Sequence, residues 1–350
     1  MKRILLLAFL SVTIHYTWAQ NCSQTLRLAR STYDQGRLHE LPKLMEKCLA
    51  NTGADGFTKQ ERVEAYKLLT MAFIYLEEPE KADSSMLLLL HTDPYFKLNE
   101  NVDPAEFIGL YKTFRTRPVF RLGVKFGVNA TQPNVSSFNP ITDGSAKYDS
   151  KIGIGGGFIG ELPINDKLTL SAELLFQQKS FTNTTISTYT TSSGPVDFST
   201  STGTESQSWL SLPILAQYQL IYKKRLEPFV VGGVSADFLL NSTTQGERRR
   251  VENQSIDVKS FSLSAQREKL NISVVLGAGV KTRIATGYLI ADVRYSYGLT
   301  KVNSLSTLYD NQYLLFDYGL MDGIFNLNSL YFNVGYVQNF FNPKKLKRKK

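Results

Sequence analysis

Histidine, the side chain that titrates nearest neutral pH, occurs only in the first part of the sequence. The three histidines are His15, His39 and His91, and no histidine follows them. A serine or water nucleophile needs a base that accepts a proton near neutral pH, and histidine commonly supplies it. Ligands for a hydrolytic metal centre are also too few. We therefore expect no enzyme activity, no catalytic residues and no cofactor or metal.

The two cysteines of the chain predict a disulfide. Cys22 lies near the start of a helix predicted over 23–35, and Cys48 lies near the end of one predicted over 41–50. An antiparallel pair of helices brings the two thiols together, and two thiols are too few for a metal site. In an oxidising compartment a disulfide is favoured. A bridge across about 25 residues should stabilise the fold by about 3 kcal/mol.

A third set of chemically active residues alternates with apolar side chains along predicted strands. Seven charged residues project to the face opposite the apolar one: Lys125, Glu161, Glu173, Asp237, Lys281, Asp292 and Arg294. Opposite charges in a narrow interior should pair, because an unpaired buried charge is costly. We expect Glu173 to contact Arg294 or Lys281. A salt-bridged, non-conducting lumen is the favoured interpretation, and a narrow gated pore is the alternative.

The sequence predicts eight strands that carry these charged residues. The connections between the strands alternate between long and short. The predicted strands are 117–129, 150–162, 167–180, 207–222, 227–240, 271–284, 287–300 and 328–341. In the last of them Leu330, Phe332 and Val334 share one face, because side chains in a strand alternate with period two. The long connections are 130–149, 181–206, 241–270 and 301–327. Tight turns at one end and long loops at the other are typical of a small transmembrane β-barrel.

Strand alternation alone does not distinguish a membrane barrel from a soluble one, because a soluble barrel alternates in the same way with its apolar face inside. The N-terminus helps to decide between them. Lys2 and Arg3 precede the apolar run 4–12. Thr17 and Ala19 place small residues at positions −3 and −1 of a cleavage site before Gln20. This pattern predicts a secretory signal peptide over 1–19, and no other run of about 18 apolar residues follows. The aromatic content of 12% agrees with the interfacial girdles of outer-membrane barrels.

Residues 20–116 differ from the strands and predict a small all-α domain. Helices are expected over 23–35, 41–50, 59–76, 79–91 and 104–114, with Thr58 and Glu61 forming a capping box. The spacing resembles degenerate tetratricopeptide (TPR) helical hairpins, which bind proteins in a groove. The possible partner surface is Tyr66, Phe73 and Tyr75. A helical plug or spacer is the alternative.

The net charge of +9 does not indicate nucleic-acid binding, because six positive charges lie in the basic tail 342–350. The tail is interpreted as solvated or as touching anionic lipid head groups. In the loop 241–270, Arg248, Arg249 and Arg250 are interpreted as a solvated run, with contact to lipopolysaccharide phosphates as the alternative. The apolar segment 305–327 is expected to pack over the barrel mouth or against a partner.

Several segments resemble the Bacteroidota outer-membrane β-barrel proteins often labelled PorT-like. They are Leu122–Asn129, Glu161–Lys179, Trp209–Leu215, Pro228–Gly233 and Arg294–Leu299, within about 220 residues in register. The resemblance implies an eight-stranded barrel in the outer membrane of a Bacteroidota-type bacterium. The family's namesake is tied to type IX secretion. The helical domain and the basic tail depart from the family's minimal pattern.

Together these features predict four segments: a signal peptide (1–19), a periplasmic TPR-like helical domain (20–116), an eight-stranded antiparallel outer-membrane β-barrel (117–341) and a basic tail (342–350). An even strand count places both chain ends in the periplasm. The leading hypothesis is a non-enzymatic barrel in outer-membrane lipid that anchors a protein-interaction domain, with a periplasmic or outer-membrane protein as partner. A small-solute channel or ligand-binding barrel is the alternative, and a surface adhesin acting through the long loops is the third.

Overall fold

The computed structural model describes residues 19–137, 144–191, 194–221, 226–250, 255–284, 286–303, 306–307, 310–320 and 322–346. They form two compact units, one comprising 1–118 with 341–350 and the other 119–340. Residues 1–18 of the predicted signal peptide and the basic residues 347–350 lie outside the described residues.

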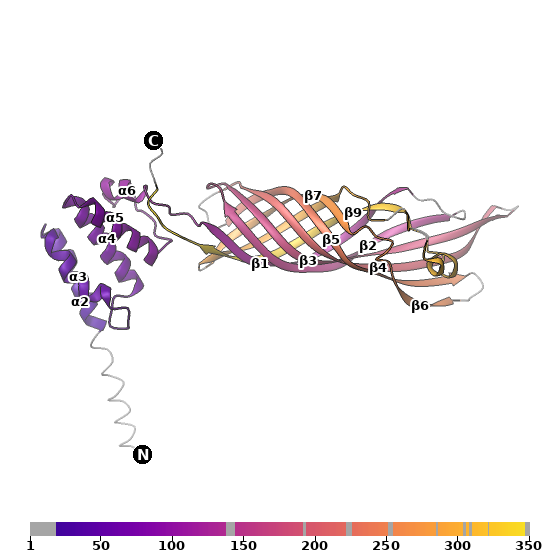
Figure 1. Ribbon diagram of the computed structural model, residues 1–350, viewed down its shortest axis with the longest axis horizontal. Helices are drawn as coiled ribbons and strands as arrows, with labels where there is room; N and C mark the ends of the chain where they lie inside the picture. Colours follow the sequence, from indigo (N-terminus) through magenta and orange to yellow (C-terminus); the bar gives the residue numbers. More distant parts are fainter. Residues whose placement is uncertain are drawn as a thin grey trace, which may run out of the picture. The chain divides into compact units, whose positions relative to one another are not determined.

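The described part of the helical unit contains five α-helices at the positions that the sequence predicts, to within a few residues. They are α2 (Ala19–Asp34), α3 (Leu41–Ala50), α4 (Lys59–Tyr75), α5 (Pro79–Thr92) and α6 (Ala105–Tyr111), with the short 3-10 helix η2 (Leu38–Glu40) before α3 (Figure 1). The capping box is present, since Thr58 and Glu61 satisfy each other's backbone amides at the start of α4. Among the described residues, no helix is long and apolar enough to cross a membrane.

The second unit is a closed antiparallel β-barrel of eight strands. The ring consists of β1 (Phe120–Ser137), β2 (Gly144–Pro163), β3 (Leu168–Thr191), β4 (Gly194–Gln219), β5 (Leu226–Arg250), β7 (Leu270–Ile284), β8 (Gly287–Gly298) and β9 (Ile324–Phe340). Pairing of β1 with β9 closes it, from Phe120 opposite Phe340 onward. A ninth strand, β6 (Ser255–Ser262), pairs only with β5 and lies outside the ring.

The strands extend much further than the sequence predicts at the end with the long connections. Residues 181–206 were expected to be a loop, yet β3 and β4 stay paired from Phe181 opposite Glu205 to Thr191 opposite Gly194. Thr is β-branched and favours extended backbone, so this Ser/Thr-rich segment continues the sheet instead of leaving it. The barrel therefore has a short-turn end and a long-hairpin end (Figure 1).

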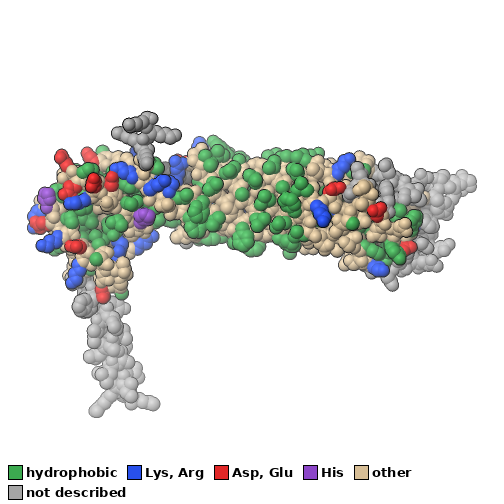
Figure 2. All heavy atoms as spheres, viewed as in Figure 1, with side chains coloured by type: hydrophobic (Ala, Val, Ile, Leu, Met, Phe, Trp, Pro, Cys, Tyr) green, Lys and Arg blue, Asp and Glu red, His purple; other side chains and the backbone are tan. Residues whose placement is uncertain are grey.

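The barrel has apolar side chains outside and polar ones inside. Large apolar residues on the outer face are about half exposed, for example Phe158 at 67%, Leu276 at 62% and Leu330 at 51%. On the face seen in Figure 2, hydrophobic side chains cover the strands as a broad band, and Lys, Arg, Asp and Glu side chains lie beyond the ends of this band. Such a surface matches a lipid environment, in which only closed barrels and helices satisfy their backbone hydrogen bonds.

Candidate functional site: the ion-paired lumen and the helical unit

A buried carboxylate organises the lumen nearest the short-turn end. Glu161, two residues before the turn after β2, accepts hydrogen bonds from Lys281 at 3.2 Å and from Arg121 at 3.2 Å. Gln217 also donates to it at 3.3 Å, and the Tyr288 hydroxyl donates to its other oxygen. Four strands thus converge on one side chain that is inaccessible to solvent.

The central cluster contains two cations and two carboxylates in direct contact. Arg294 donates to both oxygens of Glu173, at 2.9 and 2.8 Å. Lys125 lies 3.0 Å from Glu173 and 2.7 Å from Asp292. Asn333 donates to the other oxygen of Asp292 at 2.8 Å. The bidentate arginine contact fixes the geometry more tightly than a lysine could, because the guanidinium is planar.

The next cluster toward the long-hairpin end pairs Lys179 with Asp237 at 2.7 Å. Ser235 donates a further hydrogen bond to Asp237 at 2.7 Å. The Lys179 ammonium lies 5.3 Å from the centre of the Trp209 ring, within the range of a cation–π contact. Lys179 is nearly inaccessible to solvent, so both contacts compensate the loss of its hydration.

A fourth cluster lies among the long hairpins. The Arg267 guanidinium lies 2.6 Å from Glu205 and 2.7 Å from Asp322, so it joins β4 to the segment that precedes β9. Across the four clusters, six cations and six carboxylates pair with one another. The four clusters are therefore electrically balanced, as expected for charges held out of water.

Apolar side chains separate these clusters and leave little free space. One apolar group near the short-turn end includes Phe229 and Ile290, and another nearer the long hairpins includes Phe181, Trp209 and Phe325. Two cavities beside the central cluster have volumes of about 10 and 20 Å³. A cavity of that size holds about one water molecule. An eight-stranded barrel is narrow enough for side chains to fill its interior, and here they do so.

The seven charged residues proposed from the sequence all lie in this lumen, and each contacts a partner of opposite charge. Of the two expected partners of Glu173, Arg294 is the one found, while Lys281 contacts Glu161 instead. Five members of the four clusters were not predicted from the sequence: Arg121, Lys179, Glu205, Arg267 and Asp322. Lys179 was detectable, because it is six residues from Glu173 on the same strand and shares its face.

In the helical unit the predicted disulfide is present. Cys22 and Cys48 are joined with a Cα–Cα distance of 5.7 Å, and the bond ties the first turns of α2 to the last turns of α3. Nearby, Ser23 donates a hydrogen bond to Glu61 across the α2–α4 contact. Burial raises the pKa of Glu61, but hydrogen bonds from Ser23 and Thr58 outweigh burial, so the pKa falls below its usual value.

The proposed partner surface of the helical unit requires a correction. Phe73 is only 8% exposed and belongs to the apolar core of the unit, because it faces α5 rather than solvent. Tyr66 is half-buried against the same core. Tyr75 is 51% exposed and is the one member of the three that a partner could contact extensively.

The first part of the predicted basic tail is also not a free segment. The backbone amide of Arg115 donates to Lys344 at 2.9 Å, and that of Leu346 donates to Thr113 at 2.8 Å. Lys345 contacts Asp83 of α5. Residues 341–346 therefore form part of the helical unit, because their extended backbone pairs with the segment after α6 in the manner of a β-ladder.

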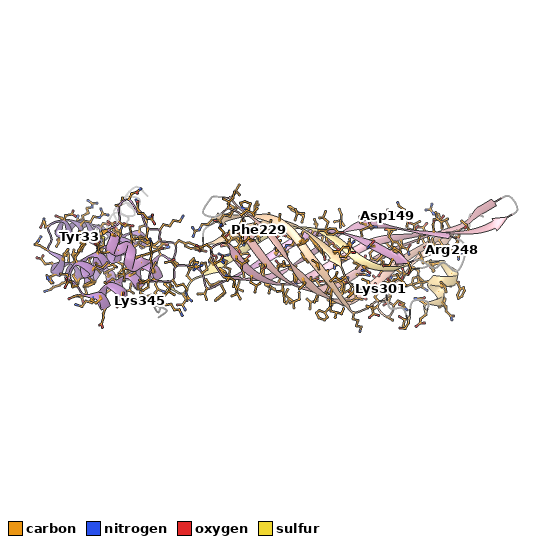
Figure 3. All side chains as sticks on the ribbon, turned by 90° about the horizontal axis from the view of Figure 1, so that it is seen from above. Tyr33, Asp149, Phe229, Arg248, Lys301 and Lys345 are labelled. Atoms are coloured by element: carbon orange, nitrogen blue, oxygen red, sulfur yellow. A yellow bond between two sulfur atoms is a disulfide. The ribbon has the colours of Figure 1, made fainter. Side chains whose placement is uncertain are left out.

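The arginine run of the third long connection is only partly solvated, since Arg249 is exposed and Arg248 is not. Arg248 is buried and donates to the backbone carbonyls of Phe316 and Asp317, at 3.0 and 2.9 Å. Arg249 is paired with Glu247 at 2.8 Å. The side chain of Arg250 lies outside the described residues. Arg248 is therefore a structural residue and is unavailable to lipopolysaccharide phosphates. Figure 3 labels it at the long-hairpin end.

No group of three or more metal-ligating side chains occurs within the described part of the chain. A closed barrel with an apolar exterior and a charged, packed lumen defines a small integral membrane β-barrel. The family model for the outer membrane protein beta-barrel domain matches residues 115–304, and the chain belongs to this family. The protein is thus an outer-membrane β-barrel protein.

Solved outer-membrane barrels of similar fold have little sequence in common with it. Neisserial surface protein A is 14% identical, with a TM-score of 0.31, covering 63% of this chain and 97% of its own. OprG from Pseudomonas aeruginosa is 12% identical, with a TM-score of 0.32, covering 65% and 98%. Ail from Yersinia pestis is 11% identical, with a TM-score of 0.26, covering 63% and 99%. A search of curated proteins gave no match.

Proposed function

We propose that this protein is a non-enzymatic outer-membrane anchor whose barrel holds a helical protein-interaction domain in the periplasm. The observation that carries the proposal is the filled lumen, in which six cations and six carboxylates pair. Among the described residues, a lumen packed in this way leaves little room for a solute or a substrate. We therefore assign the anchoring role to the barrel and the periplasmic interaction to the helical unit.

Three features support a periplasmic location for the helical unit. An even number of strands leaves both chain ends on one side of the membrane, and in such barrels this is the side of the short turns. The disulfide fits an oxidising compartment. The leader-like N-terminal sequence fits export.

The helical hairpin of α4 and α5 supports protein binding, since TPR-like repeats use such hairpins to hold partners. The sequence resemblance to the PorT-like barrels of Bacteroidota supports a role in envelope machinery such as secretion or gliding. The partner would then be a periplasmic protein or a second outer-membrane protein.

A photo-reactive amino acid placed in the full-length protein tests the proposal in living cells. The probe at position 75 uses the exposed site of Tyr75, and a matched probe at Val135, which is 38% exposed, reports on the long hairpins. We expect position 75 to cross-link to one defined envelope protein and position 135 to leave that protein unlabelled. A partner captured from position 135 alone would contradict the proposal and favour an adhesin-like role through the hairpins.

A further inference from the structure

The segment before β9 packs among the long hairpins through hydrogen bonds to three strands. We define the cap segment as the described residues between 306 and 323. It contains a five-residue π-helix, η3 (Tyr313–Asp317), seen as the short orange turn in Figure 1. Single π-helical turns are uncommon and often occur at functional sites.

Contacts from three strands hold the cap segment in place. Arg248 of β5 donates to the carbonyls of Phe316 and Asp317, and Ser201 of β4 donates to the carbonyl of Tyr318. The Tyr148 hydroxyl of β2 accepts from the amide of Gly323 at 2.9 Å. The Arg267 guanidinium contacts Asp322. These contacts come from charged or buried polar groups, so the turn is anchored and not merely a loop tip.

Glycines allow the cap segment to lie close to the hairpins. Gly319 has a φ of +61°, a conformation that other residues rarely adopt, and it ends the π-helical turn. A Cβ at Gly203 or Gly246 would come within 3.0 Å of the Leu320 side chain. A larger residue at either strand position would require the Leu320 side chain to shift. Glycine at both positions therefore allows the close packing of Leu320 on the hairpins.

The anchored turn is two-sided. Leu314 and Tyr318 point inward and are 7% and 6% exposed, and the Tyr318 ring packs edge-on against Phe261 at 5.1 Å. Tyr313 and Phe316 point outward and are each 67% exposed. Large aromatic side chains held outward are typical of binding hot spots. The hydrogen bonds to the carbonyls of Phe316, Asp317 and Tyr318 fix the backbone that carries these rings, which reduces the entropy a partner must remove.

The charges beside the rings indicate the kind of partner. Asp310 and Asp317 are exposed and flank the two aromatic residues in the sequence. The cap segment from 306 to 323 contains no lysine or arginine in its sequence. The nearby cation Arg248 is buried beneath the turn and donates to the backbone carbonyls of Phe316 and Asp317, so the exposed charges of the turn are carboxylates. Aromatic faces and carboxylates both attract cations, and carboxylates repel phosphate. This combination disfavours anionic lipid head groups and favours a basic partner. We call Asp310, Tyr313, Phe316 and Asp317 the aromatic face.

We propose that the aromatic face binds a polypeptide segment that carries Lys or Arg beside apolar side chains. The apolar groups would pack on the two rings, and the cations would lie over the rings and against the carboxylates. This site lies at the long-hairpin end of the barrel and contains no residue of the helical unit. It does not depend on the function proposed for the helical unit.

Peptide binding to the full-length protein in nanodiscs of zwitterionic lipid tests the proposal. The probe is a synthetic peptide that alternates lysine and leucine, and its comparison replaces every lysine by glutamate. We expect the lysine peptide to bind, with binding to empty nanodiscs subtracted, and the glutamate peptide not to bind. Phe316→Ser should weaken binding by about tenfold or more. Asp317→Asn should weaken it less and make it less dependent on salt.

Val135→Ser is the matched control, because Val135 is an exposed apolar residue at the same end of the barrel. It should leave binding unchanged. Equal binding of the two peptides, or full binding by Phe316→Ser that folds normally, would overturn the proposal. Binding only to an oligosaccharide array, and not to the lysine peptide, would also overturn it and would identify the aromatic face as a glycan site.

Discussion

The helical unit and the barrel are built from opposite arrangements of the same side chains. In the helical unit Leu41, Met45 and Leu89 are fully buried, and most charges lie on the surface. In the barrel Lys125, Glu173 and Asp292 are buried, while large apolar side chains face outward. The difference shows that one chain has been adapted to two solvents, water around the helices and lipid around the strands.

The largest expected effect is the loss of a buried carboxylate from the lumen. Glu173→Gln leaves Arg294 and Lys125 with reduced compensation, and breaking such a buried pair typically costs about 3–5 kcal/mol. Denaturant unfolding in detergent, followed by the gel mobility of unboiled protein, measures the change. The same substitution at Glu247, whose pair with Arg249 is exposed, should cost less than about 1 kcal/mol. Equal effects at both sites would show that the lumen pairs are not desolvated.

A second comparison introduces arginine at two equally exposed apolar positions. Val293 on the barrel is 47% exposed and Leu88 on the helical unit is 46% exposed. Val293→Arg should destabilise the barrel by about 2–4 kcal/mol, since its surroundings are lipid. Leu88→Arg should change stability by about 0.5 kcal/mol, since its surroundings are water. Unfolding in phospholipid vesicles measures both, and a tolerated Val293→Arg would argue against a lipid-facing position.

Removal of the disulfide should affect one unit only. The double substitution Cys22→Ser with Cys48→Ser opens a loop of 26 residues, and about 3 kcal/mol of stability should be lost from the helical unit. Hydrogen exchange of peptides from α2 and α3 should accelerate strongly, whereas exchange in β1 and β9 should not change. Faster exchange throughout the strands would mean that the two units do not unfold independently.

The smallest expected effect concerns acid. The pKa of Glu61 is lowered in the folded chain, so its stabilising contribution is present above the unfolded pKa and is lost as pH falls through the folded value. As pH falls through the folded pKa, the helical unit should lose less than about 0.5 kcal/mol, because water screens this incompletely buried group, and exchange should become faster at the start of α4. Glu61→Gln should remove most of this pH dependence. The exposed Glu46→Gln is the control, and a matching change there would assign the effect to general acid destabilisation.

Most of the fold follows from local sequence patterns. The capping box at Thr58 and Glu61 fixes the start of α4, and the alternation along β9 separates Leu330 from Asn333 without reference to the rest of the chain. The same alternation predicts the seven charged residues that line the lumen. Lys179 follows the same rule and could have been included.

Other features depend on distant parts of the chain and have no local signal. Arg267 lies between β6 and β7, outside the ring strands, so strand alternation cannot assign it to the lumen. The pairing of Lys344 with Arg115 joins segments more than two hundred residues apart. β3 continues through its Ser/Thr-rich part only because β4 extends beside it and pairs with it. A polar strand is stable only when it is paired. The sequence presents Phe73 as an aromatic residue on a helix, but only the packing of the other helices shows that it is buried in the core of the helical unit.

The central claim is that paired side chains close the lumen, which makes the barrel an anchor and not a channel. Single-channel recording of the full-length protein in planar bilayers tests it most directly. The account predicts no conductance steps above the background of the bilayer at any applied voltage. Reproducible unitary steps from the purified, folded protein would contradict it and would establish the small-solute channel instead.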